Sequence, residues 1–247
     1  MKNKLYNNKP FINIYEKPLL NSNISSQILF GEKFKIIEKT KKFYRIITDF
    51  DKYKGYILKS KFNDYYKPSH KVNVLKARVY KLPNQNSISN YFLPFSSEIE
   101  IIKKDKNFVK VEKNMWIKQS CIISKNKKRK DYKKIYKLFS NCKYLWGGKT
   151  YNGIDCSALV QIYYKYNNNY FPRDTKDQIK FKRGKLKTKF VSGDIIFWKG
   201  HVAVCINNKH LIHAYGPKKK VIVMPIEKTI RLIKNTANLK IQKIFSI

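Results

Sequence analysis

Two patterns of apolar and polar positions follow one another along the chain. Up to about residue 125, short runs rich in Ile, Phe and Tyr are separated by Gly, Asp and Lys, as in residues 34–40, 43–50 and 55–60. Runs of this length between turn-forming residues predict the strands of small all-β barrels. Further on, apolar positions first recur at helical spacing and then return to short β-like runs.

The first 125 residues contain an internal repeat. Residues 13–62 and 78–122 share one order of features: an aromatic residue followed by Pro, a pair of strand-like runs with polar flanks, and an aromatic-Ile step. That last step falls at residues 55–57 in the first copy and at residues 115–117 in the second. Two tandem β modules explain the repeat better than a single long sandwich does.

The remainder of the chain is expected to be helical first and β afterwards. Apolar positions at helical spacing predict a helix in residues 131–142, and a second helix is expected from Ile154 to the Asn residues at 167–169. Strands are expected at 194–198, 201–207, 210–215, 221–226 and 241–247. This order of elements predicts an α+β fold.

These patterns predict three domains. The first β module is expected in residues 1–66, the second in residues 67–125, and the α+β domain in residues 126–247. A Lys-rich run at residues 124–134 marks the boundary before the last domain, and we interpret it as a solvated linker or helix start.

The charge changes this picture little. The formal net charge is +38, and an excess of this size favours an anionic partner such as nucleic acid. The basic residues are mostly Lys, however, and they are spread from end to end among abundant Asn, Ile and Tyr, which is typical of a genome rich in A and T. We therefore expect no dedicated nucleic-acid partner, only a general attraction to acidic ligands that weakens as salt is added.

The cysteines and the N-terminus narrow the function classes further. Four cysteines form no C-x-x-C pair and have no zinc-type spacing with the four histidines, so we expect no metal and no cofactor. The N-terminus has no apolar signal segment, and no run approaches the length of a membrane span. We expect a cytoplasmic protein with free thiols, or an exported one if the start codon lies elsewhere.

One cysteine has the local context of a nucleophile. Cys156 follows a Gly-bearing loop and directly precedes the second expected helix. A helix N-terminus offers unpaired backbone N–H groups and the positive end of its dipole, and both favour a thiolate. For Cys121, Cys142 and Cys205 we expect the role of an inert small apolar residue.

A cysteine nucleophile also needs a base, and two histidines occupy suitable strands. His201 begins one strand and His213 lies near the end of the next, with residues 207–209 as the expected turn between them. With a three-residue loop the paired residue numbers sum to 416, so His213 faces Ala203, which shares a sheet face with His201. The two imidazoles are then diagonal neighbours, and a two-residue loop would separate them. His70 and His210 are expected to be surface or structural residues.

Four motifs in order carry a family resemblance. "YLWGGKTYNGIDCSALVQ" (144–161), "PRDTKDQ" (172–178), "SGDIIFWKGHVAVCI" (192–206) and "LIHAYG" (211–216) resemble the NlpC/p60-type cysteine peptidases, which cut bacterial cell-wall peptides on a papain-like fold. The family usually has Gly after the Ser of its D-C-S-G motif, where this chain has Ala158. The two β modules resemble bacterial SH3-like domains.

The resemblance implies a role for each matching residue. Cys156 is expected to be the nucleophile, His201 the general base and His213 the residue that orients the base. Tyr144, the Tyr of the Y-x-W-G-G motif, is expected to help hold the oxyanion, a stabilisation that is often the largest catalytic contribution. A packed aromatic without a catalytic role remains the alternative for Tyr144.

The preceding SH3-like modules narrow the implied substrate. NlpC-type enzymes of this architecture resemble dipeptidyl-peptidases that release L-Ala-γ-D-Glu from peptidoglycan stem peptides or muropeptides with a free N-terminus. Asp155, Ser157 and an aromatic of the first module are then expected to hold the substrate's N-terminal end. Tyr53 is the candidate aromatic, with Tyr56 in the core. Asp155 can alternatively, or in addition, cap the helix.

Two other functions stay open at this point. The same Cys-His site can serve an N-acetylmuramoyl amidase or an acyltransferase. In a non-catalytic interpretation the modules bind cell wall, or the basic surface binds nucleic acid, and the last domain is inert. The sequence leaves open the oligomeric state, the diamino acid, and whether the substrate is intact wall or recycled fragments.

Overall fold

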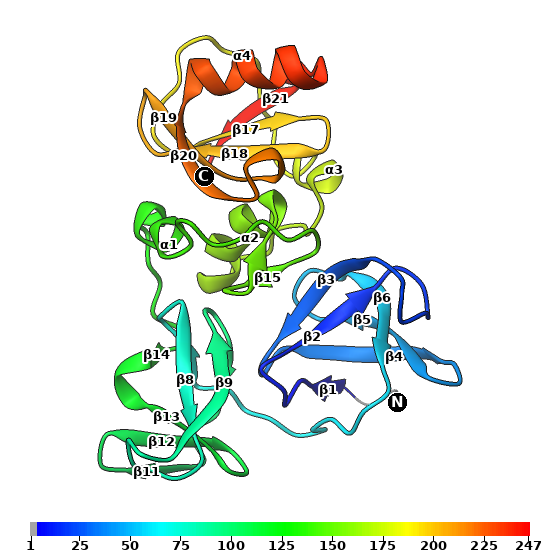
Figure 1. The fold of residues 1–247 in the computed structure, drawn as a ribbon, viewed down its shortest axis with the longest axis vertical. Helices are drawn as coiled ribbons and strands as arrows, with labels where there is room; N and C mark the ends of the chain where they lie inside the picture. The colour runs from blue at the N-terminus through cyan, green and yellow to red at the C-terminus, as the bar shows by residue number, and fades with distance from the viewer. Residues whose placement is uncertain (1–3) are drawn as a thin grey trace. The chain divides into compact units, whose positions relative to one another are not determined.

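The structure is a computed structural model that describes residues 4–247. The chain forms two compact units, residues 4–128 and residues 129–247, which are described separately. The first unit is all-β apart from one short 3-10 helix, and the second is α+β (Figure 1).

The first part of the N-terminal unit is a six-stranded antiparallel sheet with the order β1-β4-β5-β6-β2-β3. Its strands are β1 (Lys4–Tyr6), β2 (Phe11–Tyr15), β3 (Ile24–Leu29), β4 (Lys33–Lys39), β5 (Phe43–Thr48) and β6 (Lys54–Leu58). Alternate side chains of these strands point into one core. That core contains Ile14, Ile28, Phe34, Ile46 and Ile57, all fully buried.

The second part repeats this strand order. It consists of β7 (His70–Val72), β8 (Lys76–Tyr80), β9 (Ile88–Pro94), β10 (Glu98–Ile99), β11 (Lys103–Asp105), β12 (Phe108–Glu112), β13 (Met115–Lys118), the 3-10 helix η1 (Gln119–Cys121) and β14 (Ile122–Ser124). These strands form one sheet with the order β11-β12-β13-β8-β9 and another with the order β10-β7-β14. The β2-β3 and β5-β6 hairpins thus correspond to β8-β9 and β12-β13, as the repeat predicts.

The C-terminal unit opens with helices and closes with a sheet. Its helices are α1 (Tyr132–Leu138), α2 (Cys156–Tyr166), α3 (Thr175–Gln178) and α4 (Ile226–Ala237), with the 3-10 helix η2 (Gly216–Lys218). Its strands are β15 (Lys149–Thr150), β16 (Gly153–Ile154), β17 (Asp194–Trp198), β18 (His201–Cys205), β19 (His210–Tyr215), β20 (Lys220–Pro225) and β21 (Lys243–Ser246). The helices and strands predicted after residue 130 are confirmed, and so is the α+β fold class.

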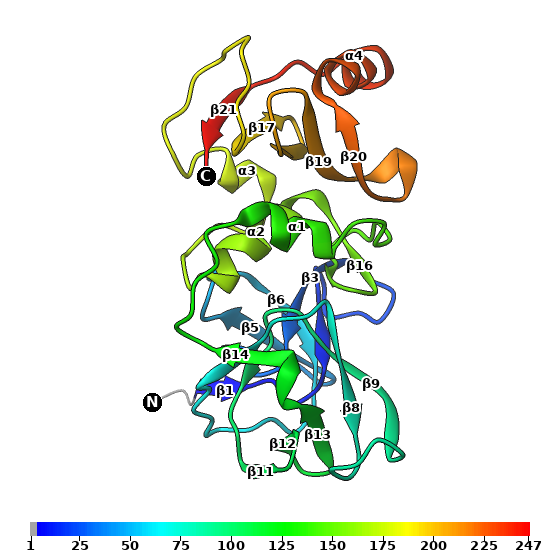
Figure 2. The same ribbon diagram turned by 90° about the vertical axis from the view of Figure 1, so that its left-hand side faces the viewer.

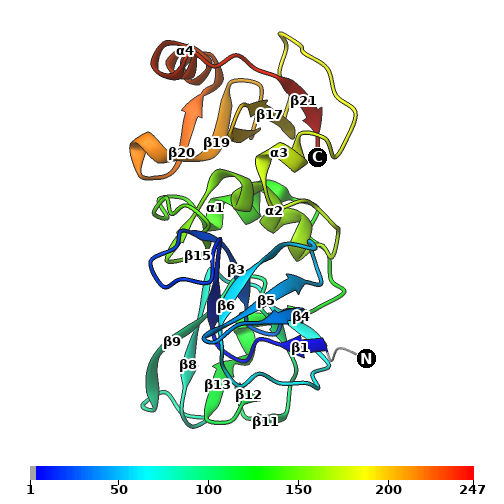
Figure 3. The ribbon, with the colours of Figure 1, turned by 90° about the vertical axis from the view of Figure 1, so that its right-hand side faces the viewer.

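The last five strands form the sheet that carries the site. Its order is β20-β19-β18-β17-β21, and every neighbouring pair is antiparallel. Helices α2 and α4 lie on opposite sides of this sheet (Figures 1 and 2). The segment between α3 and β17 passes beside β21 (Figure 3), where Lys185 forms an isolated bridge to Ile244.

Helix α4 is an element that the strand-like interpretation of the C-terminal region did not predict. Its buried residues Ile226 and Ile233 belong to one apolar cluster with Ala203, Leu211 and Met224 of the sheet. The apolar residues in "IEKTIRLIKNTA" recur every three to four positions, which is a helical period. That signal was present but was overlooked between two β-like runs.

One smaller expectation was wrong. Tyr56 is only partly buried, because Gly55 and Ile57 on either side of it point to the interior. Cys121 and Cys142 are partly buried, with Cys121 packed against the core of the second β module, and Cys205 is fully buried. None of these residues takes part in the site described below.

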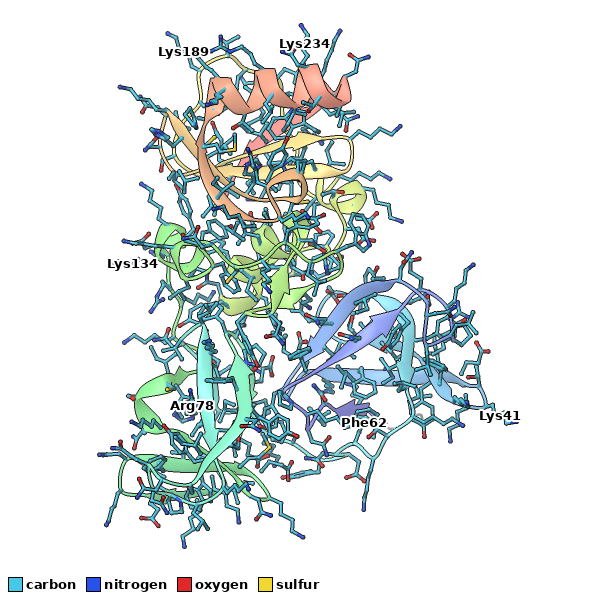
Figure 4. The ribbon with its side chains drawn as sticks, in the orientation of Figure 1. Lys41, Phe62, Arg78, Lys134, Lys189 and Lys234 are labelled. Atoms are coloured by element: carbon cyan, nitrogen blue, oxygen red, sulfur yellow. The ribbon has the colours of Figure 1, made fainter. Side chains whose placement is uncertain are left out.

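The surface carries the excess positive charge in dispersed form. Lys41, Lys134, Lys189 and Lys234 project outward from four different segments (Figure 4). Among the helices of residues 4–247, none has the length and apolar character that a bilayer span requires.

Candidate active site

The first turn of α2 places a cysteine at the helix N-terminus. Cys156 is the first residue of the helix, and Asp155 is its N-cap, whose Oδ1 accepts a hydrogen bond from the backbone N–H of Ala158 at 2.8 Å. Ser157 Oγ donates to the same Oδ1 at 2.9 Å, and Gly147 N donates to Oδ2 at 2.9 Å. These bonds fix the start of α2 and the position of the thiol.

A buried arginine completes this arrangement. Arg173 donates to both carboxylate oxygens of Asp155, at 3.0 Å to Oδ1 and 2.6 Å to Oδ2, and to Ser157 Oγ at 2.8 Å. The Arg173 side chain is 1% exposed and that of Asp155 is 8% exposed. A bidentate ion pair of this kind neutralises the carboxylate and holds it rigidly.

The thiol of Cys156 is neutral in this state. Burial raises its pKa to about 12, and the negative charge of Asp155 adds to the increase. The backbone N–H groups of Val202 and Ser157 and the charge of Arg173 act in the opposite direction, because each stabilises a thiolate. Cys156 therefore needs a base to remove its proton before it can attack a carbonyl group.

Two histidines meet on the adjacent strands. His201 Nε2 lies 2.9 Å from His213 Nδ1. The β18-β19 ladder pairs Val204 with Ile212 and Cys205 with Leu211. The residue numbers of each pair sum to 416, so the predicted register is confirmed, with both imidazoles on one sheet face.

Both imidazoles are uncharged in this environment. Burial lowers the pKa of His201 to about 4. Burial lowers the pKa of His213 to about 3, and the neighbouring His201 adds to the decrease. Tyr215 stacks on His213 with ring centroids 4.7 Å apart and planes inclined by 10°, while His213 Nε2 lies 3.4 Å from Met224 Sδ.

Strand β18 carries both His201 and a backbone N–H that bonds to the Cys156 thiol. Helix α2 packs against β18 and β19, and the Val202 N–H that stabilises the Cys156 thiolate belongs to the residue after His201. Within residues 4–247 no hydrogen bond joins the thiol to the His201 ring. Catalytic hydrogen bonds are often long in a substrate-free site and shorten when substrate binds.

Tyr144 lies near the thiol and near the start of η2, where a Cβ on Gly216 would lie 3.6 Å from the Tyr144 ring. Its pKa is raised by burial and further by the charges of Cys156 and Asp155, which places its hydroxyl close to both groups. The loop that follows Tyr144 is tight, because a Cβ on Gly148 would lie 2.4 Å from the carbonyl oxygen of Gly153. Only a glycine permits this close approach, which brings the loop against the start of α2.

Two family models match the chain. Residues 141–236 match the NlpC/P60 family, and residues 10–62 match the bacterial SH3 domain. The first match includes α2, β18 and β19, and thereby all of the geometry above. The chain contains an NlpC/P60 domain.

Two named relatives match most of the chain. The gamma-D-glutamyl-L-lysine dipeptidyl-peptidase of Bacillus subtilis (strain 168) is 25% identical over 84% of this chain and 77% of its own length. The dipeptidyl-peptidase 6 of Lysinibacillus sphaericus is 23% identical over 82% of this chain and 84% of its own. A crystal structure of an NlpC/P60 family protein from Bacillus cereus ATCC 10987 covers 90% of this chain and 94% of its own, with a TM-score of 0.77 at 18% identity.

The seven residues proposed from the sequence occupy four places. Cys156, Asp155 and Ser157 form the start of α2 in the NlpC/P60 domain, and Tyr144 approaches them from the preceding loop. His201 and His213 lie on β18 and β19. The seventh residue, Tyr53, lies in the first unit, where its backbone N–H donates to Thr48 Oγ1 at 2.8 Å. Its proximity to the thiol therefore stays a prediction.

Two residues of this site were not predicted from the sequence. Arg173 belongs to the quoted "PRDTKDQ" motif; a buried carboxylate at Asp155 implies a basic partner, but the sequence does not say which residue it is. Met224 gave no signal, because a Met in a strand is ordinarily only a core residue. Within residues 4–247, no three His, Cys, Asp or Glu side chains gather as a metal site would require.

The NlpC/P60 domain thus combines the parts that acyl transfer needs. It has a thiol at a helix N-terminus, a coupled pair of neutral imidazoles on the strands that α2 contacts, and a tyrosine hydroxyl near the thiol. Such parts can deprotonate a nucleophile and donate hydrogen bonds to a developing oxyanion.

Proposed function

We propose that this protein is a cysteine peptidase that hydrolyses the bond between γ-D-glutamate and the diamino acid of peptidoglycan stem peptides. It releases L-Ala-γ-D-Glu from substrates whose N-terminus is free. The observation that supports this most directly is the His201–His213 pair, 2.9 Å apart, on the two strands against which the Cys156 helix packs. The name of the Bacillus subtilis relative, a gamma-D-glutamyl-L-lysine dipeptidyl-peptidase, supports the choice of bond.

Acylation starts from a neutral Cys156 thiol and a neutral His201 imidazole. His201 takes the Cys156 proton while the sulfur forms a bond to the amide carbonyl carbon, and the π-electron pair of the carbonyl moves to oxygen. Tyr144 and backbone N–H groups at the start of α2 stabilise that oxygen. His201 then passes the proton to the leaving nitrogen, the C–N bond breaks, and the acyl group remains on sulfur.

Deacylation reverses the roles. His201 removes a proton from a water molecule, and the resulting hydroxide attacks the thioester carbonyl. The C–S bond breaks, and the proton held by His201 returns to the sulfur, which regenerates the neutral pair.

Recognition of the free amine requires a carboxylate that is not already neutralised. Arg173 already neutralises Asp155, so Asp155 serves chiefly to fix α2 and the loop at Gly147. Asp174 lies next in the chain, is partly buried, and within residues 4–247 its carboxylate accepts no hydrogen bond. Its pKa is raised by burial first; the charges of Arg173 and Lys176 lower it in part, and those of Asp155 and Asp177 raise it slightly. A substrate ammonium would stabilise this charge, so we extend the proposal to include Asp174.

Product analysis tests the bond and the free-amine rule together. L-Ala-γ-D-Glu-meso-diaminopimelate and its N-acetyl derivative are incubated with the full chain, and the products are identified by mass spectrometry. We expect L-Ala-γ-D-Glu and free diaminopimelate from the first substrate and much slower cutting of the second. Equal cutting of both refutes the free-amine rule, and release of muramic acid from a muropeptide would indicate an amidase instead.

Two matched pairs of variants test the residues. Cys156→Ser is expected to abolish hydrolysis and the acyl-enzyme seen by rapid-quench mass spectrometry, whereas Cys142→Ser retains both. Asp174→Asn is expected to raise KM about tenfold or more for the free-amine substrate only, since a buried charge loses its partner, whereas Asp177→Asn leaves KM unchanged. Full activity in Cys156→Ser would exclude covalent catalysis by this residue.

A further inference from the structure

The second nitrogen of His213 has a sulfur atom as its partner. His213 Nε2 lies 3.4 Å from Met224 Sδ, and the side chain of His213 is fully buried. The β19-β20 ladder produces this contact, because it pairs His213 with Ile222 and Leu211 with Met224. Met224 is thus a diagonal neighbour of His213 on the same face of the sheet.

Among residues 4–247, no other acceptor forms a hydrogen bond with this nitrogen. Tyr215 stacks almost parallel to the imidazole, so it presents a ring face rather than a hydrogen-bonding atom in the imidazole plane. Met224 itself is 7% exposed and belongs to an apolar cluster with Leu211 and Ile226.

The chemistry of sulfur decides which nitrogen carries the proton. A thioether has no hydrogen to donate and can only accept. In a neutral His213 the proton therefore belongs on Nε2, facing Met224, and Nδ1 is left with a lone pair. His201 Nε2, 2.9 Å away, must then be the donor of the bond between the rings.

We propose that Met224 is a positioning residue that selects the tautomers of both histidines, so that Nδ1 of His201 is the one unprotonated nitrogen available to the thiol. This inference rests on the proposed function for its catalytic meaning, but the tautomers themselves do not depend on it. The opposite arrangement would place an N–H of His201 where the base is needed and leave the buried Nε2 lone pair of His213 against sulfur, with no donor.

The tautomer of His213 also determines how a protonated His201 is stabilised. After Nδ1 of His201 takes the proton of Cys156, both ring nitrogens of His201 carry hydrogen. The Nε2–H bond to His213 Nδ1 then becomes charge-assisted, and His213 acts as a neutral acceptor. His213 can do so only while its own proton stays on Nε2, facing Met224.

Nuclear magnetic resonance of the full chain measures the tautomers directly. The protein is labelled with ¹⁵N-histidine, and long-range ¹H–¹⁵N couplings at neutral pH report which ring nitrogen carries hydrogen. His213 is assigned by elimination, using the signals lost in variants of His70, His210 and His201. We expect the Nε2–H form for His213 and the same form for His201. A proton on Nδ1 of His213 in the wild-type protein overturns the proposal.

Substitutions of Met224 supply the second readout. Met224→Leu keeps the volume but removes the acceptor, so we expect a mixture of His213 tautomers and a kcat lower by about three- to tenfold with little change in KM. Met224→Gln returns an acceptor oxygen, and we expect it to restore the Nε2–H form and part of kcat. Val223→Thr, on the opposite, partly exposed face of β20, is the control and should change neither.

The two readouts separate this inference from the proposed function. An unchanged tautomer, or a kcat within twofold of the wild type, in Met224→Leu refutes the role of Met224 even if Cys156 proves essential. If the protein hydrolyses no stem peptide but His213 shows the Nε2–H form that Met224→Leu abolishes, the tautomer selection stands and the proposed substrate is wrong. A Met224→Leu protein that fails to fold leaves the wild-type tautomer as the deciding measurement.

Discussion

The pair between Arg173 and Asp155 provides the sharpest test of how the site is held together. Arg173→Met removes a side chain that is 1% exposed and donates to both oxygens of Asp155. The carboxylate keeps three donors, from Gly147, Ser157 and Ala158, so the loss lies near the lower end of the range for breaking a buried pair. We expect the free energy of unfolding to fall by about 3 kcal/mol.

The double-mutant cycle isolates the pair from other effects. Asp155→Asn alone leaves the Arg173 charge buried without its anion and should cost about 3–5 kcal/mol. With both substitutions no charge is left unpaired, so the double variant should cost about as much as one of them. If the double variant costs as much as Asp155→Asn alone, the coupling energy equals the cost of Arg173→Met, about 3 kcal/mol.

Urea unfolding followed by tryptophan fluorescence measures these differences. A Trp116→Phe background removes the tryptophan of residues 4–128, so that Trp146 and Trp198 report on the second unit alone. Arg183→Met, at an exposed position, is the control and should change stability by less than about 0.5 kcal/mol. A coupling energy below about 0.5 kcal/mol would refute the inference that Arg173 neutralises Asp155.

Three further outcomes are expected. The pKa of His201 falls from 6.5 to about 4 on folding, so between pH 4 and pH 6.5 the unfolded state binds more protons than the folded state. The free energy of unfolding should therefore drop by about 3 kcal/mol as pH falls from 6.5 to 4. His201→Gln should lose this part of the slope, and an identical slope in both proteins contradicts it. In urea unfolding, Gly31→Ala should destabilise the first unit far more than Gly200→Ala destabilises the second. The backbone φ angle is positive at both glycines. Only at Gly31 would the added Cβ meet backbone, at 2.1 Å from the Glu98 carbonyl oxygen. Tyr144→Phe should lower kcat by about 10²–10³-fold with KM unchanged, and a KM effect alone would indicate packing or substrate binding instead.

The elements nearest the site could be predicted because their signals are local. The Asp-Cys-Ser sequence before an apolar helical run is sufficient to place Cys156 at a helix start, and the three-residue loop after β18 is sufficient to fix the register of the two histidines. Helix α4 was missed because its helical period lies between two strand-like runs. The family resemblance, carried by four motifs, agrees with the NlpC/P60 match over residues 141–236.

The contacts that Asp155 and His213 make depend on segments far from them in the sequence. Sequence spacing alone did not show that Arg173, 18 positions after Asp155, would neutralise that carboxylate, since the pairing depends on how the segment after α2 returns to the helix start. It did not show that Met224 would meet His213 either, because the β19-β20 ladder determines that contact.

The sequence by itself determined which residues can react and on which sheet face they lie, because helix caps and strand alternation are set by neighbours a few positions away. The tertiary structure decided their protonation and their partners. Burial makes the Cys156 thiol and the imidazoles of His201 and His213 neutral, and burial is a property of the whole packed domain. The same packing brings a cation to Asp155 and a thioether to His213, which converts a list of reactive side chains into a defined arrangement of donors and acceptors.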